Sequence, residues 1–298
     1  MTVLKNLLRG TIRTLVRPGL SPTVPVAVAR PAATALTRSA PPVRGTEATK
    51  ITIAGMPAER VVASDGVRSD VVMLYLHGGA FRIGSAFMYR PITATLAKGS
   101  KAEVVVPDYR LAPEHAFPAA HDDCHAAAKE LLGSRPRAKL VLAGDSAGGG
   151  LALATAIRLR DEGETRVAGV VLISPWLDLS MSGDSAFTKD AIDPMLSREG
   201  LRFAGEDYLR GVAPTDPVAS PLFAELRGLP PIHVEVGTDE VLLDDSTRLA
   251  ARAREAGVDV RLEVAEGLWH DYPLHAGLLA EADEANVRMF AFVRRLLG

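Results

Sequence analysis

The stretch VLAGDSAGGG, residues 141–150, places an apolar run directly before a serine that is surrounded by glycines. A flexible linker, a phosphate-binding turn and a sharp strand-to-helix turn can all contain such a stretch. Gly144 to Gly148 fits G-x-S-x-G between a strand-like run and an Ala/Leu-rich helical pattern, which is the context of a nucleophile elbow. No Gly-Lys-Ser/Thr follows, as a Walker phosphate loop would require. The sequence therefore favours an elbow that exposes the hydroxyl of Ser146 as a nucleophile.

Strand-like and helical patterns alternate on both sides of the elbow. Most of the strand-like runs are near-continuous in Val, Ile and Leu, which is typical of strands buried on both faces of a sheet. Their alternation with helices predicts a mostly parallel sheet flanked by helices, opened by an antiparallel pair. The expected strands are 51–55, 59–63, 70–77, 102–109, 139–145, 167–175, 231–237 and 260–266, and the expected helices are 119–132, 147–161, 244–256 and 276–297.

About fifty residues without a strand-like run separate PWLDLS (175–180) from PPIHVEVG (230–237). An insertion of this length between two strands of one sheet is typical of a lid. Ligands of open α/β sheets bind at the carboxyl ends of the strands, where such a lid would lie. We therefore predict an N-terminal cap arm (1–48) and a catalytic domain (49–298) with a cap insertion at about 180–215.

The composition limits the classes of partner. The chain has 298 residues, a formal net charge of −2 and 47% hydrophobic residues, which is typical of a globular protein and gives no reason to expect a nucleic-acid partner. No uninterrupted apolar run reaches the roughly 18 residues of a membrane span. A single cysteine, Cys124, excludes an intramolecular disulfide and is compatible with a cytoplasmic location.

The amino terminus is strongly basic, with no Asp or Glu in residues 1–46. Cations recur at every fourth position beside an apolar helical face. The sequence favours a helix packed over the body of the protein, and the alternative is weak contact with a lipid surface. The cations are Lys5, Arg9, Arg13 and Arg17, and the apolar positions are Leu4, Leu7, Leu8, Ile12, Leu15 and Val16.

A serine nucleophile needs a base, which follows it in the chain order of elbow enzymes. Three histidines follow Ser146. His233 lies inside an expected strand, which favours a packed core residue, and His275 is expected to begin the final helix. His270 lies in the loop after the last expected strand, and we predict that it is the base.

The acid that orients the base is expected in the loop after the preceding strand, within VGTDEVLLDDS (236–246). Asp244 and Asp245 lie where a helix begins, which favours capping and helix-dipole roles. The sequence alone leaves Asp239 and Glu240 as alternatives.

An oxyanion hole is expected at the end of an earlier strand, in HGGA (77–80). Backbone N–H groups without a neighbouring Cβ can approach a developing negative charge closely. We predict that the N–H groups of Gly78, Gly79 and Ala147 form this site. His77 is expected to hold the loop by hydrogen bonding.

The pentapeptide HDDCH (121–125) contains potential metal ligands. It begins an expected helix that packs on the sheet, and no further group of Cys and His residues lies nearby in the sequence. We therefore expect no metal site.

Four motifs in combination resemble the hormone-sensitive-lipase (GDXG) family of α/β-hydrolase carboxylesterases. They are HGGAF (77–81), PDYRLAPEHAFPAA (107–120), GDSAGGG (144–150) and SPLF (220–223). The resemblance extends from about residue 70 to the carboxyl terminus. It implies an eight-stranded α/β-hydrolase sheet, a helical cap, a Ser-Asp/Glu-His triad and no cofactor. It also implies hydrolysis of short acyl esters, from acetyl to hexanoyl, and some relatives are deacetylases.

The resemblance also bears on the acid, because members often have Asp-Pro-Leu-x-Asp in this loop. Aligning Leu242 and Asp244 with that pattern puts Glu240 on the catalytic position. The expected activity is that of a serine carboxylesterase. The alternatives are a deacetylase or acyltransferase on an acetylated metabolite, and a non-catalytic small-molecule-binding protein.

Overall fold

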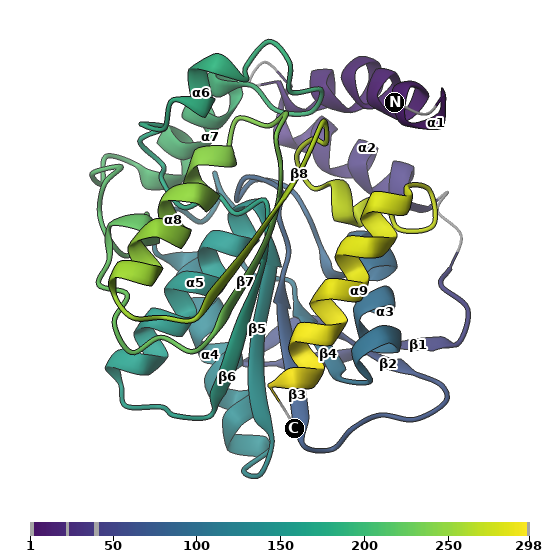
Figure 1. Ribbon diagram of the computed structural model, residues 1–298, viewed down its shortest axis with the longest axis vertical. Helices are drawn as coiled ribbons and strands as arrows, with labels where there is room; N and C mark the ends of the chain where they lie inside the picture. The colour runs from purple at the N-terminus through teal and green to yellow at the C-terminus, as the bar shows by residue number, and fades with distance from the viewer. Residues whose placement is uncertain (1–2, 22–23, 39–41, 297–298) are drawn as a thin grey trace.

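In the computed structural model, which describes residues 3–21, 24–38 and 42–296, helices cover both faces of a twisted sheet (Figure 1). The strand order is β1-β2-β4-β3-β5-β6-β7-β8, antiparallel at β1–β2 and β2–β4 and parallel elsewhere. The expected fold class, an eight-stranded, mostly parallel α/β-hydrolase sheet, is confirmed. The strands are β1 (Thr46–Ile53), β2 (Met56–Ala63), β3 (Val71–Leu76), β4 (Glu103–Pro107), β5 (Lys139–Asp145), β6 (Val167–Ile173), β7 (Ile232–Gly237) and β8 (Val260–Ala265).

The helices divide between the two faces of the sheet (Figure 1). Helices α4 (Ala119–Ser134), α5 (Ser146–Asp161) and α8 (Leu243–Glu255) pack into one apolar cluster. Helices α3 (Arg90–Ser100) and α9 (Ala280–Arg295) pack into another. Every residue of β3 and β7 is buried, as expected of strands that are covered on both faces. Strand β3 is apolar throughout, whereas β7 also contains the buried pair of His233 and Glu235.

Two expected boundaries were wrong for the same physical reason. The first strand ends at Ile53, before a turn in which Ala54 and Gly55 have φ of 47° and 77°. The last helix begins at Ala280 rather than 276, because Gly277 has φ of 79°. Left-handed backbone interrupts both strand and helix. Helix α3 was not expected from the sequence.

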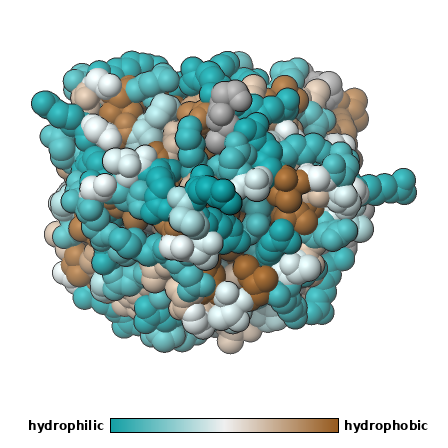
Figure 2. All heavy atoms as spheres, turned by 90° about the horizontal axis from the view of Figure 1, so that it is seen from below, coloured by the Kyte–Doolittle hydropathy of each residue, from teal (hydrophilic) through white to brown (hydrophobic). Residues whose placement is uncertain are grey.

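The cap lies at the carboxyl ends of the parallel strands (Figure 1). Its N-terminal part consists of α1 (Val3–Thr11), two short helical turns (Ile12–Val16 and Arg17–Leu20) and α2 (Val26–Arg38). The insertion after β6 contributes α6 (Ser185–Thr188) and α7 (Arg198–Leu209). The opposite end of the molecule, seen in Figure 2, is largely hydrophilic.

The four cations that recur at every fourth position of the N-terminal arm bind the protein itself. Lys5 pairs with Glu281 and Arg9 pairs with Asp239. Arg13 donates to the carbonyls of Ala191 and Ile192, and Arg17 donates to those of Asp190 and Asp193. The arm is therefore attached by its basic side to α9, to the loop after β7 and to the insertion after β6.

The expected apolar face of this arm packs only in part. Ile12 is buried and Leu8 is partly buried against the body, whereas Leu4, Leu7 and Leu15 are exposed. The helix thus packs over the body, as favoured from the sequence, largely through its cations. Among the described residues, no helix is long and apolar enough to cross a membrane.

We expect Gly148→Ala to lower the free energy of unfolding by about 1–3 kcal/mol, as overpacking does. A Cβ at Gly148 would lie 2.0 Å from the carbonyl oxygen of Leu76 and 2.5 Å from that of His77. These are backbone atoms of the neighbouring strand and turn, which cannot move aside as a flexible side chain can.

Gly133→Ala is the matched control, because a Cβ at Gly133 in α4 would meet nothing within 4 Å. Its free energy of unfolding should stay equal or rise by up to about 1 kcal/mol, the helix preference of Ala over Gly. Chemical denaturation measures both variants. Equal stability of the two would contradict the close approach at the elbow.

Candidate active site

Ser146 occupies the turn between β5 and α5. Its φ is 51°, a left-handed conformation that costs energy for any residue with a Cβ. Small residues make the turn possible, since a Cβ at Gly144 would lie 2.4 Å from the carbonyl oxygen of Gly148. The carbonyl of Ser146 accepts a hydrogen bond from the Trp176 N–H at 2.8 Å, which holds the turn in place. This is the strained strand-to-helix turn that the sequence predicted.

His270 and Glu240 lie in neighbouring loops, after β8 and β7. Oε2 of Glu240 is 3.0 Å from Nδ1 of His270, and both side chains are buried. Oε1 of Glu240 accepts hydrogen bonds from the Gly237 N–H (2.6 Å) and the Ser174 hydroxyl (2.9 Å). These donors replace water around a fully buried carboxylate. The pair therefore fixes the orientation of the imidazole ring.

Asp239, the alternative acid, points toward the cap arm. Its carboxylate forms an ion pair with Arg9 of α1. The Arg9 guanidinium also lies 5.7 Å from the ring centroid of Trp269, the residue before His270. Of the two acids that the sequence left open, Glu240 lies against His270 and Asp239 lies against Arg9.

The other side of the imidazole faces a residue that the sequence reasoning missed. Oδ2 of Asp271 lies 3.2 Å from Nε2 of His270. Burial lowers the pKa of His270, but the carboxylates of Asp271 and Glu240 outweigh it and raise the pKa well above its usual value. Within the described residues, no hydrogen bond joins the Ser146 hydroxyl to His270. The sequence feature that could have indicated this contact is the ionisable side chain directly after His270.

The turn after β3 differs from the prediction at Gly78. Its N–H donates to Oδ1 of Asp145 at 3.0 Å, and it does not line the cavity. A Cβ at Gly78 would lie 2.1 Å from Oδ2 of Asp145, so this glycine permits close packing. In this structure the Gly78 N–H is thus directed to Asp145, and its predicted place in an oxyanion hole stays a prediction. Gly79 and Ala80 line the cavity, and their N–H groups have no acceptor in the described part of the chain.

His77 holds this turn, as expected. Its Nδ1–H donates to the Gly78 carbonyl at 2.8 Å, and its ring stacks on Tyr109 at 4.2 Å between centroids. Burial lowers the pKa of His77 to about 4, so the ring is neutral.

The two other histidines after Ser146 lie apart from Glu240. His233 is buried in β7 and pairs with Glu235 at 2.8 Å, as expected of a core residue. His275 does not begin the final helix. It lines the cavity and accepts a hydrogen bond from the Trp269 indole at 3.3 Å, and burial lowers its pKa to about 4.

Asp245 and the pentapeptide HDDCH (121–125) have structural roles. Asp245 does not cap its own helix: its carboxylate accepts from the N–H groups of Leu177 and Asp178 at 2.7 and 2.9 Å. In HDDCH, four side chains have partners outside the pentapeptide: His121 with Tyr208, Asp122 with Arg158, Asp123 with Arg110 and His125 with Glu162. The described residues contain no group of three potential ligands placed to hold a metal.

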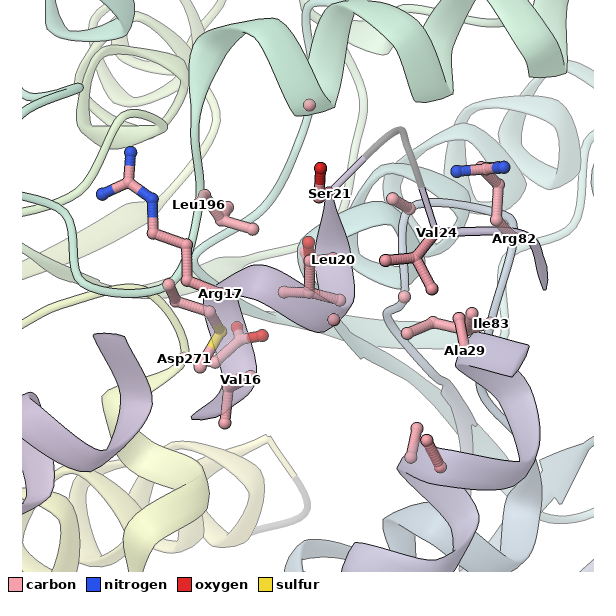
Figure 3. Close-up of a pocket in the computed structure, with 18 of the residues that line it drawn as sticks. Val16, Arg17, Leu20, Ser21, Val24, Ala29, Arg82, Ile83, Leu196 and Asp271 are labelled. Carbon is pink, nitrogen blue, oxygen red and sulfur yellow. The ribbon is translucent and has the colours of Figure 1, made fainter. Parts of the chain in front are cut away.

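A cavity of about 540 Å³ lies between the cap and the ends of the strands. Ser146, His270 and Asp271 line its floor, and residues of α2, α7 and the N-terminal turns line its walls. The walls are mainly apolar, as Figure 3 shows with the labelled side chains of Val16, Leu20, Val24, Ala29, Ile83 and Leu196. Such a site accepts a small apolar group beside the serine.

Known proteins resemble this chain over nearly its whole length. The family described as "alpha/beta hydrolase fold" matches residues 73–274. An esterase of Acinetobacter venetianus is 35% identical over 98% of this chain and 95% of its own. An acetyl-hydrolase of Streptomyces hygroscopicus is 40% identical over 76% of each chain.

A solved structure of an esterase from the bacterial hormone-sensitive lipase family is 38% identical, covers 100% of this chain and 99% of its own, and has a TM-score of 0.92. The likeness includes the cap as well as the sheet, since it spans both chains from end to end. With the elbow, the paired loops and the cap arranged as described, the chain belongs to the hormone-sensitive-lipase family of α/β hydrolases.

Proposed function

We propose that this carboxylic ester hydrolase cleaves short-chain acyl esters through an acyl-enzyme on Ser146. One observation carries the proposal: a strained elbow serine opens on the same cavity as a histidine that is 3.0 Å from a buried carboxylate. Relatives named esterase and acetyl-hydrolase support ester hydrolysis as the reaction. Reaction with a fluorophosphonate, which requires an activated serine, tests the proposal.

In the proposed reaction, Nε2 of His270 takes the proton of the Ser146 hydroxyl as its oxygen attacks the ester carbonyl. Glu240 stabilises the resulting imidazolium through Nδ1. The tetrahedral intermediate collapses when the C–O bond to the alcohol breaks and His270 returns the proton to the leaving oxygen. Water then attacks the acyl-enzyme as His270 takes its proton. The C–O bond to Ser146 breaks, His270 returns the proton to the serine oxygen, and the acid is released.

The developing oxyanion needs N–H donors aimed into the cavity. We assign this role to Gly79 and Ala80, which line the cavity, and to Ala147 in the first turn of α5. N–H groups in the first turn of a helix have no intrahelical acceptor, so that of Ala147 is available. Asp145 acts indirectly, because it anchors the turn through the Gly78 N–H.

The cavity supports a preference for short acyl groups. We expect kcat/KM for p-nitrophenyl esters to be highest between acetyl and hexanoyl and to fall for longer chains. One methylene that does not fit an apolar pocket costs about tenfold or more in kcat/KM. A profile from acetyl to hexadecanoyl measures this, and an enzyme that cleaves hexadecanoyl esters best would contradict it.

Leu196→Ala should move the optimum to longer chains, because Leu196 is buried and lines the cavity. Leu278→Ala is the matched control, since Leu278 is 54% exposed and lies outside the cavity lining. The same profile for both variants would show that the cavity wall does not select the acyl chain.

A further inference from the structure

His270 lies between two carboxylates rather than one. Glu240 faces Nδ1 at 3.0 Å and Asp271 faces Nε2 at 3.2 Å. The acyl-enzyme mechanism uses only the first, and it requires a free lone pair on Nε2 to accept the proton of Ser146. The second carboxylate therefore occupies the nitrogen on which the reaction depends.

Asp271 is held in this position by its backbone. Its φ is 58°, and its N–H donates to the Ser174 hydroxyl at 3.1 Å. The same hydroxyl donates to the Glu240 carboxylate at 2.9 Å, so Ser174 links that carboxylate and the backbone of Asp271 to the end of β6. Asp271 is only 6% exposed, lines the cavity, and its Oδ1 has no partner in the described part of the chain.

Other titratable groups surround this pair. Asp145 at the end of β5 and Tyr89 before α3 face Asp271, and the pKa of each is raised well above its usual value by burial and by neighbouring negative charge. His275 faces Asp271 from the turn after the base, and Asp193 faces His270 from the cap insertion. The cavity lining also contains Arg17 and Arg82. These cations bind elsewhere, to carbonyls of the cap insertion and to Asp207.

We infer that Asp271 is a positioning residue that holds the proton on Nε2 of His270 in the resting site, and so sets the pH above which the base can act. The imidazolium donates Nε2–H to the Asp271 carboxylate. Loss of that proton to water leaves a neutral imidazole, whose Nε2 can then accept the proton of Ser146. The inference rests on the proposed function, because it concerns the same base.

Asp271→Asn tests it with little change of shape, since Asn tolerates left-handed backbone as Asp does. Removing one of two opposite charges near the imidazolium disfavours its charged form. The acid limb of the pH–rate profile, where protonation of His270 stops the reaction, is expected to move to lower pH by about one unit. This is the low end of the pKa shift that an opposite charge at this distance causes. One unit below the wild-type midpoint, the rate should rise about fivefold.

The readout is the rate of fluorophosphonate labelling between pH 4 and 9, which depends on the serine and its base but not on an ester substrate. Asp271→Gly is the second variant, because glycine adopts φ of 58° without strain. Glu284→Gln is the matched control: it removes the same charge from an exposed position on α9, and its acid limb should not move.

An acid limb that stays at the wild-type pH in both Asp271 variants would overturn the inference. So would folded variants that are labelled at no pH, because Asp271 would then be needed for the reaction itself. A wild-type enzyme that is labelled at no pH would instead overturn the proposed serine mechanism, and with it this role of Asp271.

Discussion

Ser146→Ala is expected to lower the turnover of a short-chain ester by at least about 10⁴-fold. This lower bound is smaller than the roughly 10⁶-fold loss that follows when a serine protease loses its nucleophile. In the proposed mechanism the hydroxyl oxygen of Ser146 forms the acyl bond, and alanine has no atom that could replace it. The measurement is the hydrolysis of p-nitrophenyl butyrate by equal amounts of folded wild type and variant.

The control is the folded state of the variant. Alanine has the same Cβ and adopts the same φ of 51°, so circular dichroism and thermal unfolding should match the wild type closely. Addition of EDTA should leave wild-type activity unchanged. Full activity in a folded Ser146→Ala variant would contradict the proposed mechanism.

Glu240→Gln is expected to lower kcat by at least about a hundredfold. This lower bound is smaller than the loss of about 10⁴ in kcat when the acid of a serine protease loses its charge. In the proposed mechanism the charge of Glu240, 3.0 Å from Nδ1 of His270, stabilises the imidazolium, and an amide of the same shape does not supply that charge. Steady-state kinetics on a short-chain ester measures the effect.

Asp239→Asn is the matched variant in the same loop. Its carboxylate pairs with Arg9 and not with His270, so kcat should stay within roughly tenfold of wild type. Circular dichroism at equal protein concentration ensures that both variants are folded. The reverse ranking of the two would transfer the role of the acid to Asp239.

The parts of the site that could be predicted from the sequence are those that local backbone requirements dictate. A serine at φ of 51° needs small neighbours, and these appear in the sequence as Gly144 and Gly148. The chain order of an elbow enzyme pointed to His270 and narrowed the acid to two adjacent residues. Glu240 and Asp239 could not be separated by pattern alone, and the resemblance to the family was needed to favour Glu240.

The remaining features depend on contacts between segments far apart in the chain. The contact of the Gly78 N–H with Asp145 was not foreseen, because that carboxylate lies at the end of a different strand. Arg9 was expected on a helix packed by its apolar face, but its partner Asp239 lies 230 residues away. Asp271 was missed because its effect depends on which ring nitrogen of His270 its carboxylate faces, and this orientation is not visible in the sequence.

The central claim, that Ser146 carries the acyl group, is tested most directly by mass spectrometry of the protein after reaction with a fluorophosphonate, followed by peptide mapping. We predict one adduct per chain, located on Ser146, formed in step with the loss of esterase activity. Complete inactivation with the adduct on another residue, or full activity with Ser146 stoichiometrically modified, would contradict the claim.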